Sequence, residues 1–478
     1  MNIRIIITVF FISIVFSNCK TLKTSPLPEL KLPEAYEGKY DSLQVLRPDR
    51  SDFFRDTLLL SLIDSALKNN PDMLIATERI EMARAVLRQS RAAVLPSVDA
   101  VVSAGVEKFG DYTLDGVGNY DTNLSGNIHG DRRIPDPTPN FFLGLRSNWE
   151  LDLWKKLRHR KKAAVARFLG SNKGRQLVST MLTAQVASAY YELTAFDNKL
   201  KVIRKNIELQ EQALELSRVQ KLGGRATELA VKQFEAQLYN TKSLEHTVIQ
   251  QIAETENYLN FLLGRYPQEV KRYRLVSELK LPEKLFKGLP SQMLLNRPDI
   301  QQAELELVAS ESETRASRAA FFPSLVLTPF MGYNSFRAEV LFNPSSLAWG
   351  VVGGVTGPLF NRREIRSTYE RVLAERKTAF YSYQKTVLDG FREVSSFLSG
   401  MDNFRKVYDQ REREFQTLKE AVGISRDLYL AGRASYLEII TAQRNMLEAE
   451  LQMIEARKSV FLTSVDLYRA VGGGLERN

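Results

Sequence analysis

The sequence has little of the chemistry that enzymes and metal sites need. Its 478 residues include one cysteine, Cys19, and three histidines, His129, His159 and His246. The histidines lie far apart and show no metal-ligand spacing, so no metal site is predicted. There is no P-loop, no GxGxxG and no GxSxG motif. We therefore predict neither an enzyme nor a cofactor, and a single cysteine excludes an internal disulfide.

Proline is absent from two long tracts. All 17 prolines lie within 26–139 and 267–358, which leaves 140–266 and 359–478 free of proline. Because proline interrupts helices, such tracts permit very long ones. The distribution favours two copies of one architecture over three average domains.

The second tract reads as one long helical hairpin, 361–473. Its outgoing leg extends over roughly 70 residues, on the order of 100 Å if unbroken. Its return leg repeats every seven residues, with apolar residues at all the d-like positions, which predicts a coiled coil. The d-like positions are Ile440, Leu447, Ile454, Phe461 and Tyr468, and the a-like positions are Leu437, Arg444, Leu451, Lys458 and Val465. Arg444 and Lys458 either face a lumen or pair with acidic neighbours.

The two halves of the chain share short motifs. Asn70-Pro71-Asp72-Met73 matches Arg297-Pro298-Asp299-Ile300, and Gly224-Arg225-Ala226 matches Gly432-Arg433-Ala434. We predict two repeats, 57–266 and 298–478, joined by a linker, 267–297. Each repeat would hold a short helix, a β-hairpin and a long helical hairpin. The β-hairpins are predicted at 97–153 and 323–358, and the helical hairpins at 155–264 and 361–471. Extra residues in the first copy, 109–139, predict a long exposed loop.

Four segments between the helices alternate with period two. Apolar residues share one face of each segment, as at Val98, Val102 and Val106, or at Leu325 and Leu327. Each run is about 9–11 residues, the length of a tilted transmembrane strand. A half-buried sheet of a soluble protein would show the same alternation. Because four strands cannot close a barrel, membrane-spanning strands would require several chains.

The N-terminus reads as an export signal. A short positive start precedes an apolar run, Ile5–Phe16, which is too short to span a bilayer. Small residues before Cys19 are typical of a lipobox, which predicts a signal peptide, 1–18, and a lipidated Cys19. An ordinary cleaved signal with an incidental cysteine is the alternative. The proline-containing segment 19–56 predicts an extended tether.

Positive charge predominates, with a formal net charge of +10. No nucleic-acid-binding motif accompanies it, so a solvated basic surface is favoured and no nucleic-acid partner is predicted. The basic run 155–162, with Arg362, Arg363 and Arg366, would form a belt at a membrane boundary or a solvated helix start.

Several motifs resemble those of the TolC-like outer-membrane efflux proteins, in their lipoprotein branch (OprM/NodT-like). The motifs are Trp149-Glu150-Leu151-Asp152-Leu153-Trp154, Asn296-Arg297-Pro298-Asp299-Ile300, Phe322-Pro323-Ser324-Leu325, Gly357-Pro358-Leu359-Phe360 and the segment 383–394, close to YxxTVLxAFxEV. The resemblance implies a mixed membrane protein: a homotrimer with a shared 12-stranded β-barrel in the outer membrane and a coiled-coil tunnel through the periplasm. It implies no catalysis. Expected partners are outer-membrane lipid, a periplasmic membrane-fusion adaptor and an inner-membrane RND-type or ABC pump.

Two groups of residues are candidate sites. The turns of the helical hairpins carry Gly223, Gly224, Arg225 and Ala226 in the first copy and Ala431, Gly432, Arg433 and Ala434 in the second. Glycine permits the reversal there, and the resemblance implies that an adaptor docks on these tips. Arg426 and Asp427 lie one to two turns before the second tip, where rings of charge would constrict a trimeric tunnel. An exposed charge pair is the plainer interpretation.

Three functions remain open at this point. The first is a passive exit duct for small molecules, favoured by the strands that precede both long helices. The second is a type I protein secretion channel of the same architecture. The third is a periplasmic coiled-coil scaffold or adaptor lipoprotein, which would more commonly contain a single helical hairpin.

Overall fold

A computed structural model describes residues 50–128, 130–272, 291–358 and 362–473. The predicted signal peptide, Cys19 and most of the tether lie outside the described residues, as does most of the linker 267–297. No helix in the described ranges is both long and apolar enough to cross a membrane.

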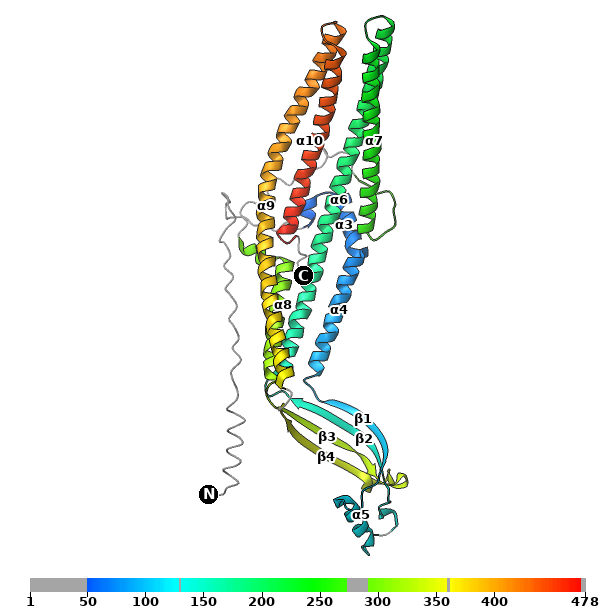
Figure 1. The fold of residues 1–478 in the computed structure, drawn as a ribbon, viewed down its shortest axis with the longest axis vertical. Coiled ribbons are helices and arrows are strands. Elements are labelled where there is room, and N and C mark those ends of the chain that lie inside the picture. The colour runs from blue at the N-terminus through cyan, green and yellow to red at the C-terminus, as the bar shows by residue number, and fades with distance from the viewer. Residues whose placement is uncertain (1–49, 129, 273–290, 359–361, 474–478) are drawn as a thin grey trace.

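The two halves of the molecule share the order short helix, two strands, long helix and return helix, and the first half also contains α2, α3 and α5 (Figure 1). The first half consists of α2 (Arg50–Phe54), α3 (Thr57–Asn69), α4 (Pro71–Ala92), β1 (Ser97–Glu107), α5 (Leu114–Leu124), β2 (Thr138–Leu151), α6 (Lys156–Leu222) and α7 (Glu228–Leu262). The second consists of α8 (Pro298–Ala319), β3 (Ser324–Ser335), β4 (Leu347–Thr356), α9 (Arg362–Leu430) and α10 (Tyr436–Ala470). Short 3₁₀ helices occur at Gly130–Arg132, Ser291–Asn296, Ala338–Val340 and Pro344–Ser346.

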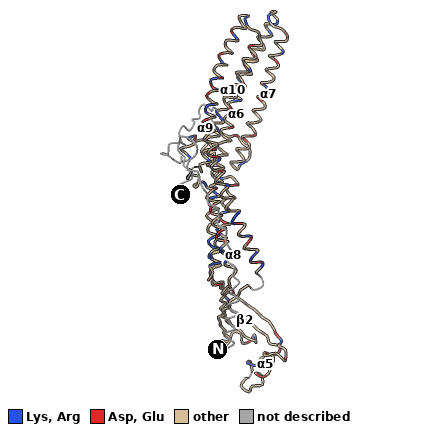
Figure 2. The backbone as a smooth tube through the Cα atoms, turned by 60° about the vertical axis from the view of Figure 1, so that its left-hand side comes forward, with Lys and Arg blue, Asp and Glu red and all other residues tan. Residues whose placement is uncertain are grey.

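All four strands form one antiparallel sheet in the order β1-β2-β3-β4. Pairing of β2 with β3 joins the two halves, with Leu143 opposite Tyr333. The strands contain 11, 14, 12 and 10 residues. Charged residues are few in this sheet and frequent along the helices (Figure 2).

The helices form a single curved layer next to the sheet (Figure 1). Near the sheet α6 packs between α4 and α8, and α8 packs against α9. Farther from the sheet α6 packs between α7 and α10, and α10 packs against α9. Both long helices, α6 and α9, therefore extend through both levels, and each level is completed by two shorter helices.

The largest apolar core lies at the middle of the helical layer, where the shorter helices meet end to end. Phe53 and Phe54 of α2 are 5% exposed and pack on Tyr468 of α10, with ring centroids 4.6 and 5.2 Å away. Asp56 caps α3 by accepting from Leu58 N, and it also accepts from the buried Tyr190 hydroxyl at 2.7 Å.

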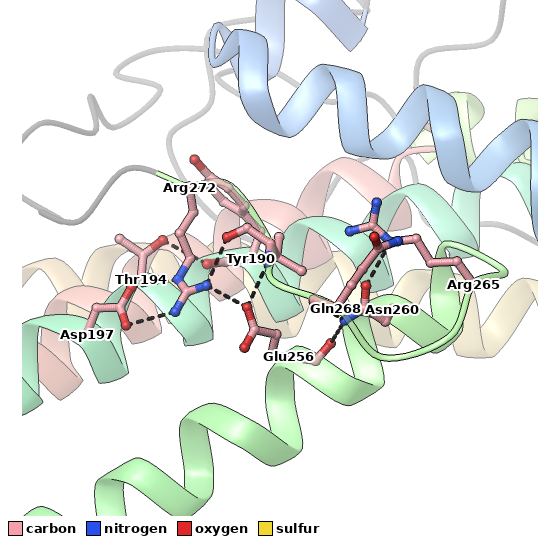
Figure 3. Close-up of polar contacts among 9 residues, drawn as sticks. Tyr190, Thr194, Asp197, Glu256, Asn260, Arg265, Gln268 and Arg272 are labelled. Carbon is pink, nitrogen blue, oxygen red and sulfur yellow. Dashed lines mark hydrogen bonds and ion pairs between the residues drawn. The ribbon is translucent and has the colours of Figure 1, made fainter.

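Polar contacts hold the segment that follows α7 against this core (Figure 3). Arg272 binds both carboxylate oxygens of Asp197, at 2.6 and 3.0 Å, and also Glu256 at 2.9 Å. Asn260 accepts from Arg265 and donates to the carbonyl of Gln268. This end of the predicted linker is therefore tied to α6 and α7.

Some predicted details were wrong. The tether was expected to be extended to residue 56, but its last residues form α2, because Phe53 and Phe54 enter the core. The segment 109–139 was expected to be a loop, but it contains the helix α5. Thr113 caps the first turn of α5 by accepting a hydrogen bond from Gly116 N. The short helices were expected over about 71–95 and 298–322, but α4 and α8 end three residues earlier, at Ala92 and Ala319. The residue directly before a proline disfavours helix, and Pro96 and Pro323 follow.

The seven-residue seam of α10 is only partly buried. Leu447, Ile454, Phe461 and Tyr468 are buried as predicted, whereas Leu437 and Arg444 are exposed. Lys458 pairs with Glu455 at 2.5 Å and lies 5.7 Å from the Phe196 ring centre, so its acidic-neighbour interpretation is confirmed.

Candidate functional site

One face of the sheet is apolar and exposed. Every second residue on each strand contributes to it, and these side chains remain open to solvent in the single chain. The most exposed members are Val98, Val102, Val106, Leu145, Met331, Leu347, Trp349, Val351 and Val355, at 45–79%. An apolar face that crosses a whole sheet requires an apolar environment or a partner.

The opposite face of the sheet is polar in places and closely packed at its centre. Asp99 and Arg146 are direct neighbours there, and Arg146 lies over the Phe142 ring at 4.8 Å. Gly144 and Gly332 pair across β2 and β3, where any Cβ would lie 2.5 Å from the other backbone. The missing side chains leave room for the Phe142 ring, which is 3% exposed.

Both lateral edges of the chain lack partners among the described residues. β1 and β4 each pair on one side only. The same edges continue upward as α4 and α7 on one side and as α9 on the other (Figure 1). A strand edge presents unpaired N–H and C=O groups, which favour pairing with another chain.

The basic run is partly neutralised where α6 begins. Lys156 pairs with Glu150 at 2.6 Å, and Asp152 accepts from the backbone N–H groups of Leu157 and Arg158. Burial lowers the pKa of His159, and the positive charge of Arg315 lowers it further. Part of the basic run therefore interacts with acidic residues at the end of β2 and stabilises the junction between β2 and α6.

The first tip is a tight reversal between α6 and α7. Gly224 has φ +70°, and Arg225 N donates to Gln220 O at 2.8 Å, which closes the end of α6. Thr227 then caps α7 by accepting from Ala230 N. Gly223, Gly224 and Arg225 are exposed, and Ala226 is half-buried.

The second tip repeats this geometry with different side chains around it. Gly432 has φ +70°, and Arg433 N donates to Leu428 O at 2.8 Å. Ser435 and Glu438 form a capping box at the start of α10. Ala431, Gly432 and Arg433 are exposed, and Ala434 is half-buried.

The two helical hairpins are joined close to their tips by a contact that sequence reasoning missed. The Tyr429 hydroxyl donates to Gln220 Oε1, and Tyr429 also packs on the apolar cluster of Phe234 and Ile439. Arg426 and Asp427 are exposed, and neither has an ion-pair partner in the part of the chain that the structure describes. No local sequence pattern predicts this contact, because it joins residues far apart in the chain.

A second missed feature lies where α8 begins. Arg297, 5% exposed, binds Asp299 at 2.7 Å and donates to Ala470 O at 3.0 Å. Glu393 of α9 lies 2.9 Å from Arg297 in an ion pair and also accepts from Arg469 at 2.8 Å. Burial alone would lower the pKa of Arg297, but the hydrogen bond and charge of Asp299, with the charge of Glu393, raise it.

Metal ligands do not gather anywhere in the described ranges. No group of three or more His, Cys, Asp or Glu side chains there has the spacing to hold a metal ion. The candidate functional parts are therefore surfaces: the apolar sheet face, the two edges and the two tips.

Known proteins share this architecture. A family described as outer membrane efflux protein matches residues 62–265 and 289–473. The chain is 28% identical to the solvent efflux pump outer membrane protein SrpC of Pseudomonas putida, covering 92% of this chain and 91% of the relative. It is 26% identical to the cation efflux system protein CusC of Escherichia coli K12, covering 97% of this chain and 98% of that relative.

A solved structure of CusC has the same fold, with a TM-score of 0.81 at 26% identity, covering 95% of this chain and 100% of that one. These similarities agree with the helical layer and the sheet described above, and they place the protein in the outer membrane. The chain therefore belongs to the outer membrane efflux protein family, whose members are the non-enzymatic outer-membrane channels of efflux systems.

Proposed function

We propose that three copies of this chain form the exit duct of a tripartite efflux system. The observation that carries the proposal is the four-stranded sheet with an exposed apolar face and two unpaired edges. In a bilayer unpaired backbone groups are too costly, so β1 of one copy would pair with β4 of the next. Three copies would give the 12-stranded barrel that the family resemblance implies.

The positions of aromatic residues support a membrane-spanning sheet. Trp154 stacks on Phe322 where the strands meet the helices, with ring centroids 4.6 Å apart. Trp349, 75% exposed, lies toward the far end of the sheet, and in the adjoining loop Phe342 packs edge-on against Tyr333, with ring centroids 6.0 Å apart. Aromatic residues concentrate at both interfaces of membrane barrels.

The helices would continue the barrel as a tunnel through the periplasm. Neighbouring copies would meet through α9 on one side and through α4 and α7 on the other. An inner-membrane RND-type or ABC pump would deliver small molecules to this tunnel through an adaptor. The sequence relatives are named for solvents and cations, so small molecules are favoured over secreted proteins.

A matched pair of substitutions tests the membrane face. Val351 and Val352 are neighbours on β4, 65% and 61% exposed, and they face opposite sides of the sheet. Val351→Lys would place a charge toward lipid, at a cost of about 2–4 kcal/mol near the bilayer midplane, whereas Val352→Lys would face the lumen. We expect only Val351→Lys to abolish trimer assembly in the outer membrane.

Mass measurement and conductance provide the second test. The purified protein should behave as a trimer in detergent and conduct ions in planar bilayers. A monodisperse monomer with intact strands contradicts the proposal. Equal trimer assembly by the Val351→Lys and Val352→Lys variants also contradicts it.

We also propose that Cys19 becomes the acylated first residue of the mature protein. The small residues before it and the absence of any other cysteine support this. Mass spectrometry of the mature chain should detect lipid on Cys19, and Cys19→Ala should remove it. An unmodified Cys19 in the mature protein contradicts the assignment.

The tips are proposed as the adaptor-docking surface. Arg225 and Arg433 are exposed beside glycine turns that need no arginine side chain. Arg225→Glu with Arg433→Glu should therefore preserve the trimer and weaken cross-linking to the adaptor. Lys201→Glu with Lys406→Glu, on the long helices α6 and α9 about 35–40 Å from the tips, is the charge-matched control. Full efflux by the arginine double variant would exclude these arginines from docking.

Arg426 and Asp427 are proposed to narrow the tunnel mouth. Both are exposed in the single chain, so in a trimer each would form a ring of three like charges. Replacing both with alanine should raise single-channel conductance. Unchanged conductance would make them ordinary surface charges.

A further inference from the structure

A small cavity lies between α8 and α9, close to the sheet. Its volume is about 210 Å³, and it is lined by Glu311, Thr314, Arg315, Arg318, Tyr369 and Arg376. Arg318 lies in the last turn of α8, just before β3, and Tyr369 lies in the second turn of α9, just after β4. The cavity therefore sits on the side of the helical layer nearest the sheet.

Positive charge predominates in the cavity. Three arginines line it with one carboxylate, and Glu311 is only loosely paired with Arg376, at 3.7 Å. Arg315 and Arg318 have no ion-pair partner within the described ranges. Arg318 also offsets the negative end of the α8 dipole, which would otherwise disfavour an anion.

Two buried donors in the cavity wall lack partners. Tyr369 is 0% exposed, and its hydroxyl makes no hydrogen bond with any described residue. Arg376 Nε is also buried and without a hydrogen-bond partner there. Phe321 packs edge-on against the Tyr369 ring at 5.9 Å, which fixes the position of that ring. Buried polar groups are normally satisfied, so both atoms point to a missing acceptor.

We propose that this cavity binds a phosphate group. A phosphate supplies several acceptor oxygens for the Tyr369 hydroxyl, the Arg376 guanidinium and the two arginines of α8, which suits guanidinium geometry. Two sources share this chemistry: the headgroup of an anionic phospholipid and free phosphate. The lipid source rests on the proposed function, because only a membrane-spanning sheet brings the cavity to the level of lipid phosphates.

Binding to the purified full chain in detergent tests the proposal. Native mass spectrometry with added phosphatidylglycerol, with phosphatidylcholine as the zwitterionic comparison, addresses the lipid source. Thermal stabilisation by inorganic phosphate, with chloride at equal ionic strength as the comparison, addresses the free anion. Retention of phosphatidylglycerol alone assigns a headgroup, whereas stabilisation by inorganic phosphate assigns the free anion. If phosphatidylglycerol is not retained and inorganic phosphate does not stabilise the chain, the proposal is overturned.

Substitutions locate the bound group. Tyr369→Phe removes only the unpaired hydroxyl and should weaken binding roughly 2- to 10-fold, while leaving the unliganded protein at least as stable. Arg318→Gln with Arg376→Gln should weaken it more than tenfold. Controls on α9 outside the cavity are Tyr381→Phe and Arg371→Gln, whose side chains are exposed.

Equal binding by the cavity variants and their controls overturns the site. Because binding is measured without transport, this result is separate from the test of the duct. A chain that binds phosphate but does not conduct ions would contradict the proposed exit duct and leave the proposed phosphate site intact.

Discussion

The two halves of the molecule have helices of nearly the same lengths, but different side-chain interactions stabilise the matching helix ends. The helices α4 and α8 contain 22 residues each, α7 and α10 contain 35 each, and α6 and α9 contain 67 and 69. Where the short helix begins, the first half has Asn70 and the second has Arg297. Asn70 makes neutral hydrogen bonds to Asp72 N and Leu262 O, at 2.8 and 2.9 Å. Arg297 instead joins an ionic network.

The tips differ in the opposite sense, with the ion pair in the first half. Lys221 and Glu228 pair across the first tip, whereas Tyr429 and Tyr436 stand at the matching positions of the second. Both glycine turns nevertheless have the same φ of +70°. The comparison teaches that helix ends and glycine caps set the backbone path, while the side chains around them are free to differ.

The largest expected effect comes from breaking the ionic junction. Arg297→Met removes one of the two arginine partners of Glu393, whose side chain is 12% exposed, and leaves Ala470 O without its donor. Breaking a buried ion pair costs about 3–5 kcal/mol, and the remaining contact of Glu393 with Arg469 should keep the loss of stability near the lower end. The midpoint of helix unfolding, followed by circular dichroism, should fall accordingly.

The double variant Arg297→Met with Glu393→Leu separates charge from packing. It removes both buried partners and should recover part of the lost stability. If the single variant unfolds at the parental midpoint, the network does not stabilise the junction.

The neutral junction should be less sensitive. Asn70→Ala removes the cap of α4 and leaves Leu262 O unpaired, for a loss of about 1–3 kcal/mol by the same measurement. Asn70→Ser keeps an uncharged capping oxygen and loses the donation to Leu262 O, so its loss of stability should fall between zero and that of Asn70→Ala. A loss as large as that of Arg297→Met would contradict the comparison.

The sequence predicted the elements better than their contacts. Proline-free tracts and glycine turns act locally, so both helical hairpins and both tips could be placed. The period-two alternation placed all four strands, and their apolar face is the one observed. The short helix α5 was missed because the glycines and asparagines of 109–139 favour turns over helix.

Contacts between distant residues had no local signal. Arg297 was recognised as part of a motif, but its pairing with Glu393 depends on α9 lying beside the start of α8. The d-like positions of α10 gave the buried seam correctly from Leu447 onward. At Leu437 the pattern failed, because near the tip the single chain leaves that face of the helix open.

A moderate effect is expected at the second tip. Tyr429→Phe removes the hydrogen bond to Gln220 and keeps the ring in its apolar cluster. Amide exchange in the last turns of α6 and α9 should become faster by up to about tenfold, the value of one hydrogen bond. Tyr436→Phe, in the same cluster, should leave exchange unchanged. Equal exchange in the Tyr429 variant and the parent would show that the contact does not hold the hairpins together.

The smallest effect should distinguish the two tips by pH. The hydrogen bond and charge of Lys221 lower the pKa of Glu228 below its ordinary 4.5. A depressed folded-state pKa contributes stability above the unfolded value and loses it as pH falls through the folded value. Below about pH 4.5, amides around Thr227 should therefore exchange faster, relative to their intrinsic rates, than at pH 6. Glu228→Gln should remove this dependence. The second tip has tyrosines at the matching positions and should lack the dependence once Glu438→Gln has replaced the carboxylate of its capping box. Equal pH dependence at the first tip and at the Glu438→Gln second tip, or none at the first, would mean that the exposed Lys221–Glu228 pair does not stabilise the turn.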